Sequence, residues 1–158
     1  YEVVQRWVQR QPSRVWAFGQ IFSESRFDPE TGRDKSVRIP ESLSYTAVYD
    51  DGLQLTGLMT GMELGSGRDE YAICGSKGTL RLDLQTGTLF QTLIGETQTI
   101  IDPKSETIGS WNVEADFIDS IRSGRPVTLT SFQDGLAYMK FTDAVKASFD
   151  ADGAWQSI

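Results

Sequence analysis

The sequence contains no histidine and only one cysteine, and these two gaps exclude several kinds of active site. Without histidine, neither a Ser–His nor a Cys–His nucleophile pair can form. Zinc sites built on histidine or on several cysteines are excluded for the same reason. The single Cys74 rules out an internal disulfide and fits a reducing compartment. We therefore expect a cytoplasmic protein. Cys74 lies in the apolar, strand-like run Tyr71–Cys74, so we expect it to be a buried, inert thiol.

Long hydrophobic runs and basic clusters are missing as well. No apolar stretch approaches the roughly 20 residues that a transmembrane helix needs. The net charge is −7, from 15 basic and 22 acidic residues. Nucleic acids and anionic membranes attract positively charged surfaces, so we expect neither as a partner.

A glycine-rich dinucleotide-binding turn is also absent. The segment Gly65–Glu70 begins like one, but it lacks the third glycine and no helical pattern follows, which predicts a hairpin loop. Gly75–Gly78 has neither the spacing nor the following helix of a phosphate-binding loop, and we interpret it as a turn. Gly57 and Gly61 form a GxxxG pattern inside a predicted strand, so it implies no membrane dimerisation.

The 158 residues suit one domain, residues 1–158, with a full-sized core. The first segment, 1–10, has the apolar spacing of a helix that Pro12 ends. Residues 14–22 predict a strand that is apolar on both faces and therefore covered on both sides. Residues 25–41 carry many charges without a clear period. They predict a solvated loop, with an arm lying over a partner domain as the alternative.

From residue 42 to residue 101, apolar residues recur at every second position, which is the period of a strand. Asp51–Gly52 is a strong hairpin signal, and further turns are predicted at 75–78 and 85–87. The pattern predicts an antiparallel meander of about six strands. The strand at 14–22 is expected to join the same large sheet.

Two helices are predicted to follow the strands. Ser110 is a suitable N-cap for the first, in which Val113, Phe117 and Ile121 form an apolar stripe before Gly124 and Pro126 end it. The second opens with Ser131 and Asp134, which have the spacing of a capping box. One face of this last helix is small and apolar, which allows close packing on a sheet; its members are Ala137, Phe141, Ala144 and Ser148.

These elements predict an α+β fold, with a large, mostly antiparallel, open-faced sheet and helices packed on one face. The opposite face carries Thr, Gln and Ser mixed with aromatic residues and Leu58. Such a face is too apolar to stay bare, so we expect a homodimer through the open sheet face. The alternative is that loops cover it.

Carboxylates provide no obvious catalytic group. Asp116 and Asp119 lie one helical turn apart, but they fall opposite the apolar stripe, which favours a solvated helix face. Asp50 and Asp51 are typical turn residues. The residues of this chain alone do not assemble into a recognisable active site.

Four segments in this order and spacing resemble the C-terminal domain of the Gfo/Idh/MocA (glucose–fructose oxidoreductase/inositol dehydrogenase/MocA) family of oxidoreductases. The fold implied is of the glyceraldehyde-3-phosphate dehydrogenase-like C-terminal domain type. The segments that carry the resemblance are Arg6–Trp7 before the strand at Val15, the Asp51–Gly52 hairpin, the turn 73–80, and the helix with Trp111, Glu114, Phe117 and Ile118 followed by Gly124–Pro126.

The resemblance implies a parent enzyme of two domains. An N-terminal Rossmann domain would bind NAD or NADP and supply a catalytic lysine. The C-terminal domain would supply an aspartate, a histidine, substrate contacts and the oligomer interface, and the substrates would be sugars, cyclitols and their derivatives. Here the Rossmann domain is missing and Tyr1 is expected to stand just after the position of the family's histidine. No catalytic residue carries over, and we expect this chain alone to bind no cofactor.

What the resemblance leaves for this chain is a contribution to substrate binding from the loop 63–68. Glu63 and Arg68 are the candidate substrate-binding residues, with exposed loop charges as the alternative interpretation. The leading hypothesis is the substrate-binding and dimerisation domain of an NAD(P)-dependent oxidoreductase, catalytically incomplete in isolation. The alternatives are a free-standing, non-catalytic interaction or ligand-binding module, or an enzyme with a carboxylate site at Asp116 or Glu63.

Overall fold

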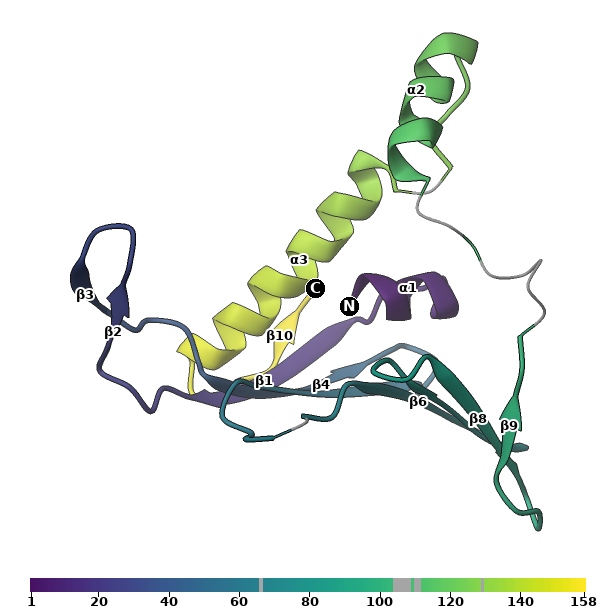
Figure 1. The fold of residues 1–158 in the computed structure, drawn as a ribbon, viewed down its shortest axis with the longest axis horizontal. Coiled ribbons are helices and arrows are strands. Elements are labelled where there is room, and N and C mark those ends of the chain that lie inside the picture. The colour runs from purple at the N-terminus through teal and green to yellow at the C-terminus, as the bar shows by residue number, and fades with distance from the viewer. Residues whose placement is uncertain (66, 104–108, 110–111, 129) are drawn as a thin grey trace. The chain divides into compact units, whose positions relative to one another are not determined.

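A computed structural model describes residues 1–158 except 66, 104–108, 110–111 and 129 (Figure 1). The chain divides into two compact units. The first comprises Tyr1–Met62 and Val113–Ile158, and the second comprises Glu63–Asn112.

The first unit is built on a four-stranded antiparallel sheet with the strand order β10-β1-β4-β5. Its strands are β1 (Arg14–Gln20), β4 (Ser42–Val48), β5 (Gln54–Thr60) and the short β10 (Gln156–Ser157). The predicted Asp51–Gly52 hairpin is confirmed: it joins β4 to β5, and Gly52 takes a φ of 86° that a glycine adopts without strain. Cross-strand packing also requires glycine at position 57, because a Cβ atom there would lie 2.3 Å from the ring of Tyr45.

The long helix α3 (Phe132–Asp150) packs on one face of this sheet and forms the core with it (Figure 1). Its predicted capping box is confirmed, since the Ser131 hydroxyl and the Asp134 carboxylate each accept a hydrogen bond from the other's backbone N–H. The predicted apolar face is confirmed as well; its buried residues are Ala137, Phe141, Ala144, Val145 and Ser148.

Ser148 connects α3 to the sheet through hydrogen bonds to one residue of β1. The backbone N–H of Ala17 donates to the Ser148 hydroxyl at 2.8 Å, and that hydroxyl lies 3.3 Å from the Ala17 carbonyl oxygen. The pairing of β10 with β1 stops at Val15, so Ser148 takes the place of a strand partner for Ala17. A buried backbone group that lost this partner would be costly.

The other two helices of the first unit pack less closely. Helix α1 (Glu2–Val8) ends at Gln9, which has a φ of 55°, and α2 (Val113–Ser123) ends before Gly124, which has a φ of 65°. Neither helix has a buried residue. The expected cap at Ser110 and the contribution of Trp111 fall outside the described residues.

The second unit contains a separate four-stranded antiparallel sheet with the strand order β6-β7-β8-β9. Its strands are β6 (Glu70–Gly75), β7 (Gly78–Asp83), β8 (Thr88–Leu93) and β9 (Thr99–Ile101). The predicted turns at 75–78 and 85–87 are confirmed. The segment Gly65–Glu70 was wrongly predicted as a hairpin loop, because β5 and β6, the strands on either side of it, belong to different sheets.

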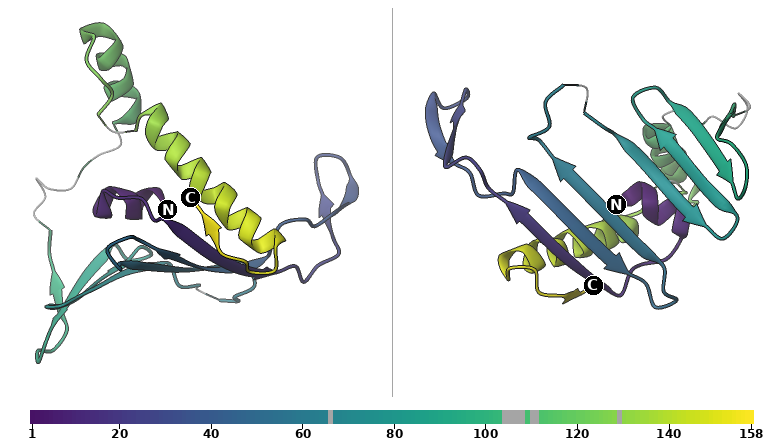
Figure 2. Two further views of the ribbon diagram at one scale, coloured as in Figure 1. Left: turned by 180° about the vertical axis from the view of Figure 1, so that it is seen from behind. Right: turned by 90° about the horizontal axis from the view of Figure 1, so that it is seen from below.

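The prediction of a solvated loop at residues 25–41 is also wrong, because this segment contains a β-hairpin. Strands β2 (Ser25–Asp28) and β3 (Arg33–Ser36) pair in antiparallel fashion and project from the end of the first sheet (Figures 1 and 2). The Asp28 carboxylate accepts hydrogen bonds from the backbone N–H of Glu30 and the hydroxyl of Thr31 and so fixes the turn. Charged cross-strand pairs replace the apolar alternation that marks a strand in the sequence.

The predicted α+β fold, with antiparallel open sheets and a helix packed on one face, is confirmed, although the described strands form two four-stranded sheets and a two-stranded hairpin instead of one large sheet. Two burial predictions are wrong. Phe18 is 45% exposed, so β1 is covered on one side in the described chain, and Cys74 is exposed on β6.

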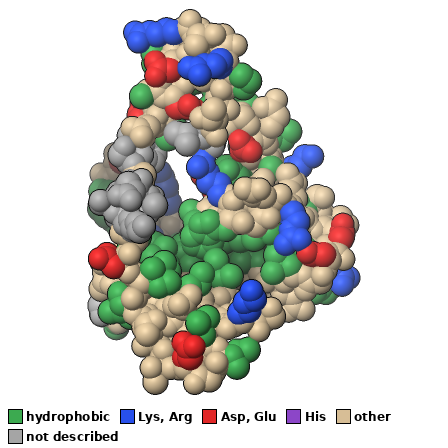
Figure 3. Space-filling view, turned by 90° about the vertical axis from the view of Figure 1, so that its right-hand side faces the viewer, with side chains coloured by type: hydrophobic (Ala, Val, Ile, Leu, Met, Phe, Trp, Pro, Cys, Tyr) green, Lys and Arg blue, Asp and Glu red, His purple; other side chains and the backbone are tan. Residues whose placement is uncertain are grey.

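Figure 3 shows hydrophobic side chains uncovered at the surface, with charged side chains scattered around them. No helix in the described part of the chain has the length and apolar character to cross a membrane.

Candidate functional site

A polar pocket of about 610 Å³ lies in the first unit, between α1, the segment after it and the start of α3. Pockets of this size accommodate small molecules. Amide, hydroxyl and charged side chains define this polar pocket: Gln5, Arg6, Gln9, Arg10, Gln11, Thr128, Asp134 and Tyr138.

Helix α1 and the segment after it provide one wall of the polar pocket. Gln5 and Arg6 lie on the helix, whereas Gln9 is its left-handed C-cap and Arg10 and Gln11 follow it. The Oε1 atom of Gln5 is buried and has no hydrogen-bond partner. A buried acceptor without a donor is unfavourable, and a ligand hydroxyl or a water molecule placed there would satisfy it.

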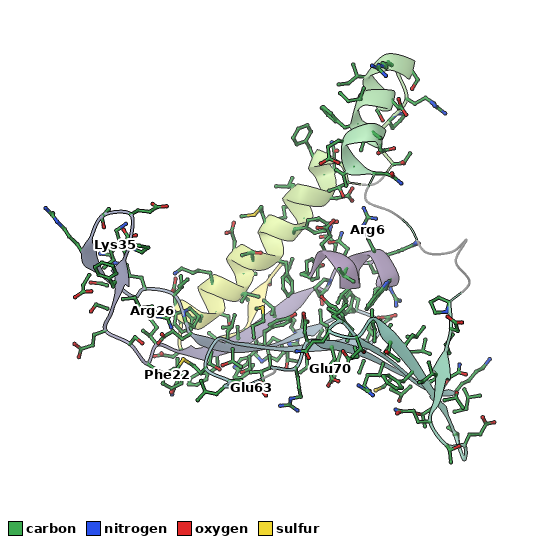
Figure 4. The ribbon with its side chains drawn as sticks, in the orientation of Figure 1. Arg6, Phe22, Arg26, Lys35, Glu63 and Glu70 are labelled. Carbon is green, nitrogen blue, oxygen red and sulfur yellow. The ribbon has the colours of Figure 1, made fainter. Side chains whose placement is uncertain are left out.

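The cations of the polar pocket are already paired with acidic side chains. The Nε atom of Arg6 lies 3.9 Å from the Glu2 carboxylate, and Arg6 also donates to the Thr130 hydroxyl at 3.1 Å; Figure 4 labels this residue. Arg10 forms an ion pair with Asp51. Because neither guanidinium carries an uncompensated charge, the lining favours a neutral, hydroxyl-rich ligand over an anion.

The two titratable residues of α3 in the polar pocket keep their usual charge states. Hydrogen bonds from Ser131, together with the nearby Arg6, lower the pKa of Asp134, so this side chain is a carboxylate at neutral pH. Burial, with the acidic Glu2 and Asp134 close by, raises the pKa of Tyr138. Tyr138 therefore remains a neutral phenol that can both donate and accept a hydrogen bond.

Glu63 and Arg68, the residues predicted from the sequence, lie in the second unit, and neither lines the polar pocket. They face each other across their loop, with 3.8 Å between the Arg68 Nε and a Glu63 carboxylate oxygen. Their side chains are 40% and 75% exposed, respectively. Such a pair contributes little to stability, and a substrate contact from it stays a prediction.

Asp116 has a structural role that the sequence interpretation did not include. Its carboxylate accepts hydrogen bonds from the Thr128 backbone N–H at 3.0 Å and from the Thr128 hydroxyl at 2.7 Å. The carboxylate thus holds the segment that follows α2 against that helix. Asp119, on the same helix, is exposed. Among the described residues, no group of three or more Asp, Glu or Cys side chains is placed to hold a metal ion.

The open face of the first sheet, on the side away from α3, is the second feature with functional potential (Figure 2). The register places Phe18, Ser44 and Leu58 side by side across β1, β4 and β5. Trp16 stacks on Phe18 with 6.5 Å between ring centroids, and the next row adds Thr46 and Thr56. The predicted mixture of aromatic, hydroxyl and leucine side chains on this face is therefore present.

Comparison with known proteins identifies the fold. No protein-family model matches the sequence, and no curated protein matches it. Among solved structures, an oxidoreductase domain protein from Kribbella flavida matches with a TM-score of 0.77 and 20% sequence identity, over 99% of this chain and 47% of that one. An inositol dehydrogenase homolog complexed with NAD+ from Azotobacter vinelandii matches with a TM-score of 0.72 and 13% identity, over 94% of this chain and 43% of that one.

The chain has the fold of the C-terminal domain of Gfo/Idh/MocA-type oxidoreductases. It spans about half the length of the structures that it matches. The same fold also occurs in a super-repressor mutant of Gal80p from Saccharomyces cerevisiae, with a TM-score of 0.71 and 12% identity, over 99% of this chain and 46% of that one. The predicted resemblance is thus confirmed at the level of the fold.

The sequence interpretation missed the polar pocket, although one signal for it was present. Gln5, Gln9 and Gln11 occur within seven positions of each other. Glutamine side chains are neither nucleophiles nor titratable groups, so this spacing did not stand out. Asp134 was recognised as a capping residue, but its position beside Arg6 and Tyr138 depends on how α1 and α3 pack together.

Proposed function

We propose that this chain is the substrate-binding and dimerisation domain of an NAD(P)-dependent oxidoreductase that acts on a sugar, a cyclitol or a related polyol in the cytoplasm. The observation that carries this proposal is that nearly the whole chain superposes on about half of each matched oxidoreductase. The other half would be a Rossmann domain that binds NAD or NADP and supplies the hydride-transfer chemistry. In isolation this chain neither catalyses the reaction nor holds the nicotinamide cofactor.

The composition of the polar pocket supports a polyol as the ligand. Three glutamines, a threonine and a neutral tyrosine offer donors and acceptors to several hydroxyl groups. The unpartnered Gln5 Oε1 provides an acceptor for one of them. The exposed thiol of Cys74 agrees with a reducing compartment. Glu63 and Arg68 remain proposed substrate contacts.

Binding of myo-inositol tests the polar pocket directly. We expect millimolar myo-inositol to shift the NMR signals of Gln5, Gln9 and Tyr138, because weak binding is usual for half of a two-domain site. The variant Gln5→Leu should abolish these shifts, whereas Gln133→Leu, a matched change on α3 outside the pocket, should preserve them. Shifts that persist in Gln5→Leu would contradict the assignment. Micromolar NAD+ affinity by calorimetry would contradict the claim that this chain lacks a cofactor site.

Dimerisation through the open sheet face has a separate test. Leu58 and Ile121 are each 65% exposed, but Leu58 lies on the open face and Ile121 on α2. We expect light scattering at tens of micromolar to find a dimer, Leu58→Glu to dissociate it, and Ile121→Glu to leave it intact. A monodisperse wild-type monomer at that concentration would overturn the proposal.

A second candidate function is a non-catalytic interaction module, and the match to Gal80p favours it because that protein is described as a repressor. The coding DNA upstream of Tyr1 distinguishes the two candidates. A glycine-rich strand–turn–helix segment, a Lys-Pro motif and a histidine just before Tyr1 would support the oxidoreductase. A start codon within a few residues of Tyr1 would support the interaction module.

A further inference from the structure

Three buried side-chain polar atoms of the first unit have no hydrogen-bond partner in the described part of the chain. They are the Tyr1 hydroxyl, the Tyr49 hydroxyl and the Oε1 atom of Gln5. Tyr49 as a whole is only 2% exposed. A polar atom that is buried without a partner gives up its hydrogen bonds to water and gains none in return, so such atoms are rare in folded proteins. Each of the three therefore requires an explanation.

The two phenols lie close together on the side of the first sheet that carries α1 and α3 (Figure 1). Tyr1 stacks on Phe141 of α3 with 3.9 Å between ring centroids. Tyr49 directly follows β4 and stands two positions after Ala47, which belongs to the same core as Phe141. Burial raises the pKa of Tyr1, and the neighbouring Tyr49 phenol raises it further. Because one phenol affects the ionisation of another only at short range, the two hydroxyl groups are neighbours.

Gln5 lies next to both phenols. It stands one turn along α1 from Tyr1, since its backbone N–H donates to the Tyr1 carbonyl oxygen at 3.0 Å. Burial also raises the pKa of Tyr49, and the ion pair of Arg10 with Asp51 lies near enough to act on that pKa as well. Arg10 lines the polar pocket together with Gln5. The three unpartnered atoms are therefore gathered at the buried side of the polar pocket.

The donors and acceptors of these atoms match one oxygen that carries hydrogen. The Oε1 atom of Gln5 only accepts hydrogen bonds, whereas a neutral phenol both donates and accepts. The raised pKa values of Tyr1 and Tyr49 keep both phenols neutral at neutral pH. A water molecule or an alcohol hydroxyl can donate to Oε1 while it accepts from a phenol, but a carboxylate or phosphate oxygen without a proton cannot. Buried water molecules typically make about three hydrogen bonds to groups that would otherwise be unsatisfied.

We propose that Tyr1, Tyr49 and Gln5 form a buried binding site for a single hydroxyl group, supplied by a water molecule or by the bound polyol. In the free chain the occupant is water, and its hydrogen bond to Oε1 fixes the direction of the Gln5 amide in the wall of the polar pocket. When a polyol binds, one of its hydroxyl groups reproduces the same hydrogen bonds and displaces the water. This second step rests on the proposed function, whereas the water-bound site does not.

Removal of one hydroxyl at a time tests whether the site exists. Tyr49→Phe should lower the melting temperature by about 2–4 °C, because the occupant loses one of its three partners. If the Tyr49 hydroxyl had no partner at all, removing it would relieve an unsatisfied buried group. A melting temperature that rises in Tyr49→Phe would therefore overturn the proposal.

A double-mutant cycle tests whether the two phenols share their partner. The loss in Tyr1→Phe combined with Tyr49→Phe should be smaller than the sum of the two single losses, because both hydroxyls bond to one occupant. The matched control is Tyr71→Phe, the same chemical change in the second unit, and its effect should add to that of Tyr49→Phe. Additive losses for Tyr1 and Tyr49 would contradict a shared site.

High-resolution crystallography of the unaltered chain identifies the occupant. In the free chain we expect one water oxygen within about 3.2 Å of both hydroxyls and of the Gln5 Oε1 atom, and no oxygen at that point would overturn the site. With myo-inositol, a ligand hydroxyl in the same place supports the displacement step. A retained water beside bound myo-inositol assigns the site to water and refutes displacement. If myo-inositol binds nowhere in the polar pocket, the proposed ligand is wrong, while the water and the double-mutant cycle still establish the site.

Discussion

The two units of this chain contain sheets of the same size but differ in burial. In the first unit, α3 covers one face of the sheet, and Val15, Ala17 and Ala47 are completely buried. In the second unit, no described residue is buried, although β6 to β9 pair along their whole length. Hydrogen-bonded strands can therefore be specified locally, whereas a core requires a second layer.

The candidate binding residues also differ between the two units. The polar pocket lies in the first unit, where Tyr1, the N-cap of α1, stacks on Phe141 of α3. The predicted pair Glu63 and Arg68 lies on an exposed loop of the second unit. Of the residues that line the polar pocket, Gln5, Asp134 and Tyr138 lie on helices, and sites on packed elements are better positioned than sites on loops. The proposed polyol site is therefore placed in the first unit.

The largest expected effect comes from truncating the aromatic centre of the first unit. Phe141 is 4% exposed, stacks on Tyr1 with 3.9 Å between ring centroids and contacts Tyr45 edge-on. We expect Phe141→Ala to lower the free energy of unfolding by about 3–5 kcal/mol, because it leaves a cavity. Urea denaturation monitored by circular dichroism measures this value.

The matched control for Phe141 lies in the second unit. Ile100 is 66% exposed, so Ile100→Ala should change the free energy of unfolding by no more than about 0.5 kcal/mol. Equal losses in the two variants would show that the second unit has a core comparable to the first in solution, and the contrast between the units would fail.

A smaller effect is expected from the hydroxyl that joins α3 to β1. Ser148→Ala leaves the buried N–H of Ala17 without its acceptor, and we expect a loss of about 1–3 kcal/mol. Thr142→Ala is the control, because the Thr142 hydroxyl is exposed and bonds only within its own helix. If the two alanine variants are equally stable, the Ser148 bridge does not contribute as the geometry implies.

Much of the first unit could be predicted because its pattern is local. The capping box, the buried face of α3 and the Asp51–Gly52 hairpin each depend on residues close together in the sequence. The hairpin formed by β2 and β3 was missed because one face of it is charged, as the facing pairs Arg26–Lys35 and Asp28–Arg33 show, and on the other face Phe27 lies opposite Asp34. The apolar alternation that predicts a strand is absent there.

The errors in the second unit have a different cause. The strands β6 to β9 were predicted correctly, but Cys74 was expected to be buried because it follows apolar neighbours. Periodicity reports which side chains share a face, whereas burial also requires something to cover that face. The polar pocket was missed for a related reason, since it arises from the contact between α1 and α3 and has no motif of its own.

A still smaller effect is expected at the start of α3. Ser131→Ala removes the hydroxyl that accepts from the Asp134 N–H, and an N-cap change of this kind costs about 1 kcal/mol. Ser131→Asp, which restores an acceptor, should recover most of the loss in thermal unfolding. A loss that is the same in both variants would mean that the cap does not limit the stability of the first unit.

The most selective effect is a dependence of stability on pH at the base of the hairpin formed by β2 and β3, where the Glu41 carboxylate accepts its hydrogen bonds. The pKa of Glu41 falls from its ordinary value of 4.5 to about 2 in the folded chain. Its contribution is therefore complete above about pH 4.5 and is lost as the pH falls toward about 2, because protonation then favours the unfolded chain. Glu41→Gln should be less stable than the wild type at neutral pH and should lose less stability between neutral pH and about pH 3. Melting temperatures of both chains at the two pH values measure this difference, and parallel losses would show that Glu41 is not the titrating group of the first unit.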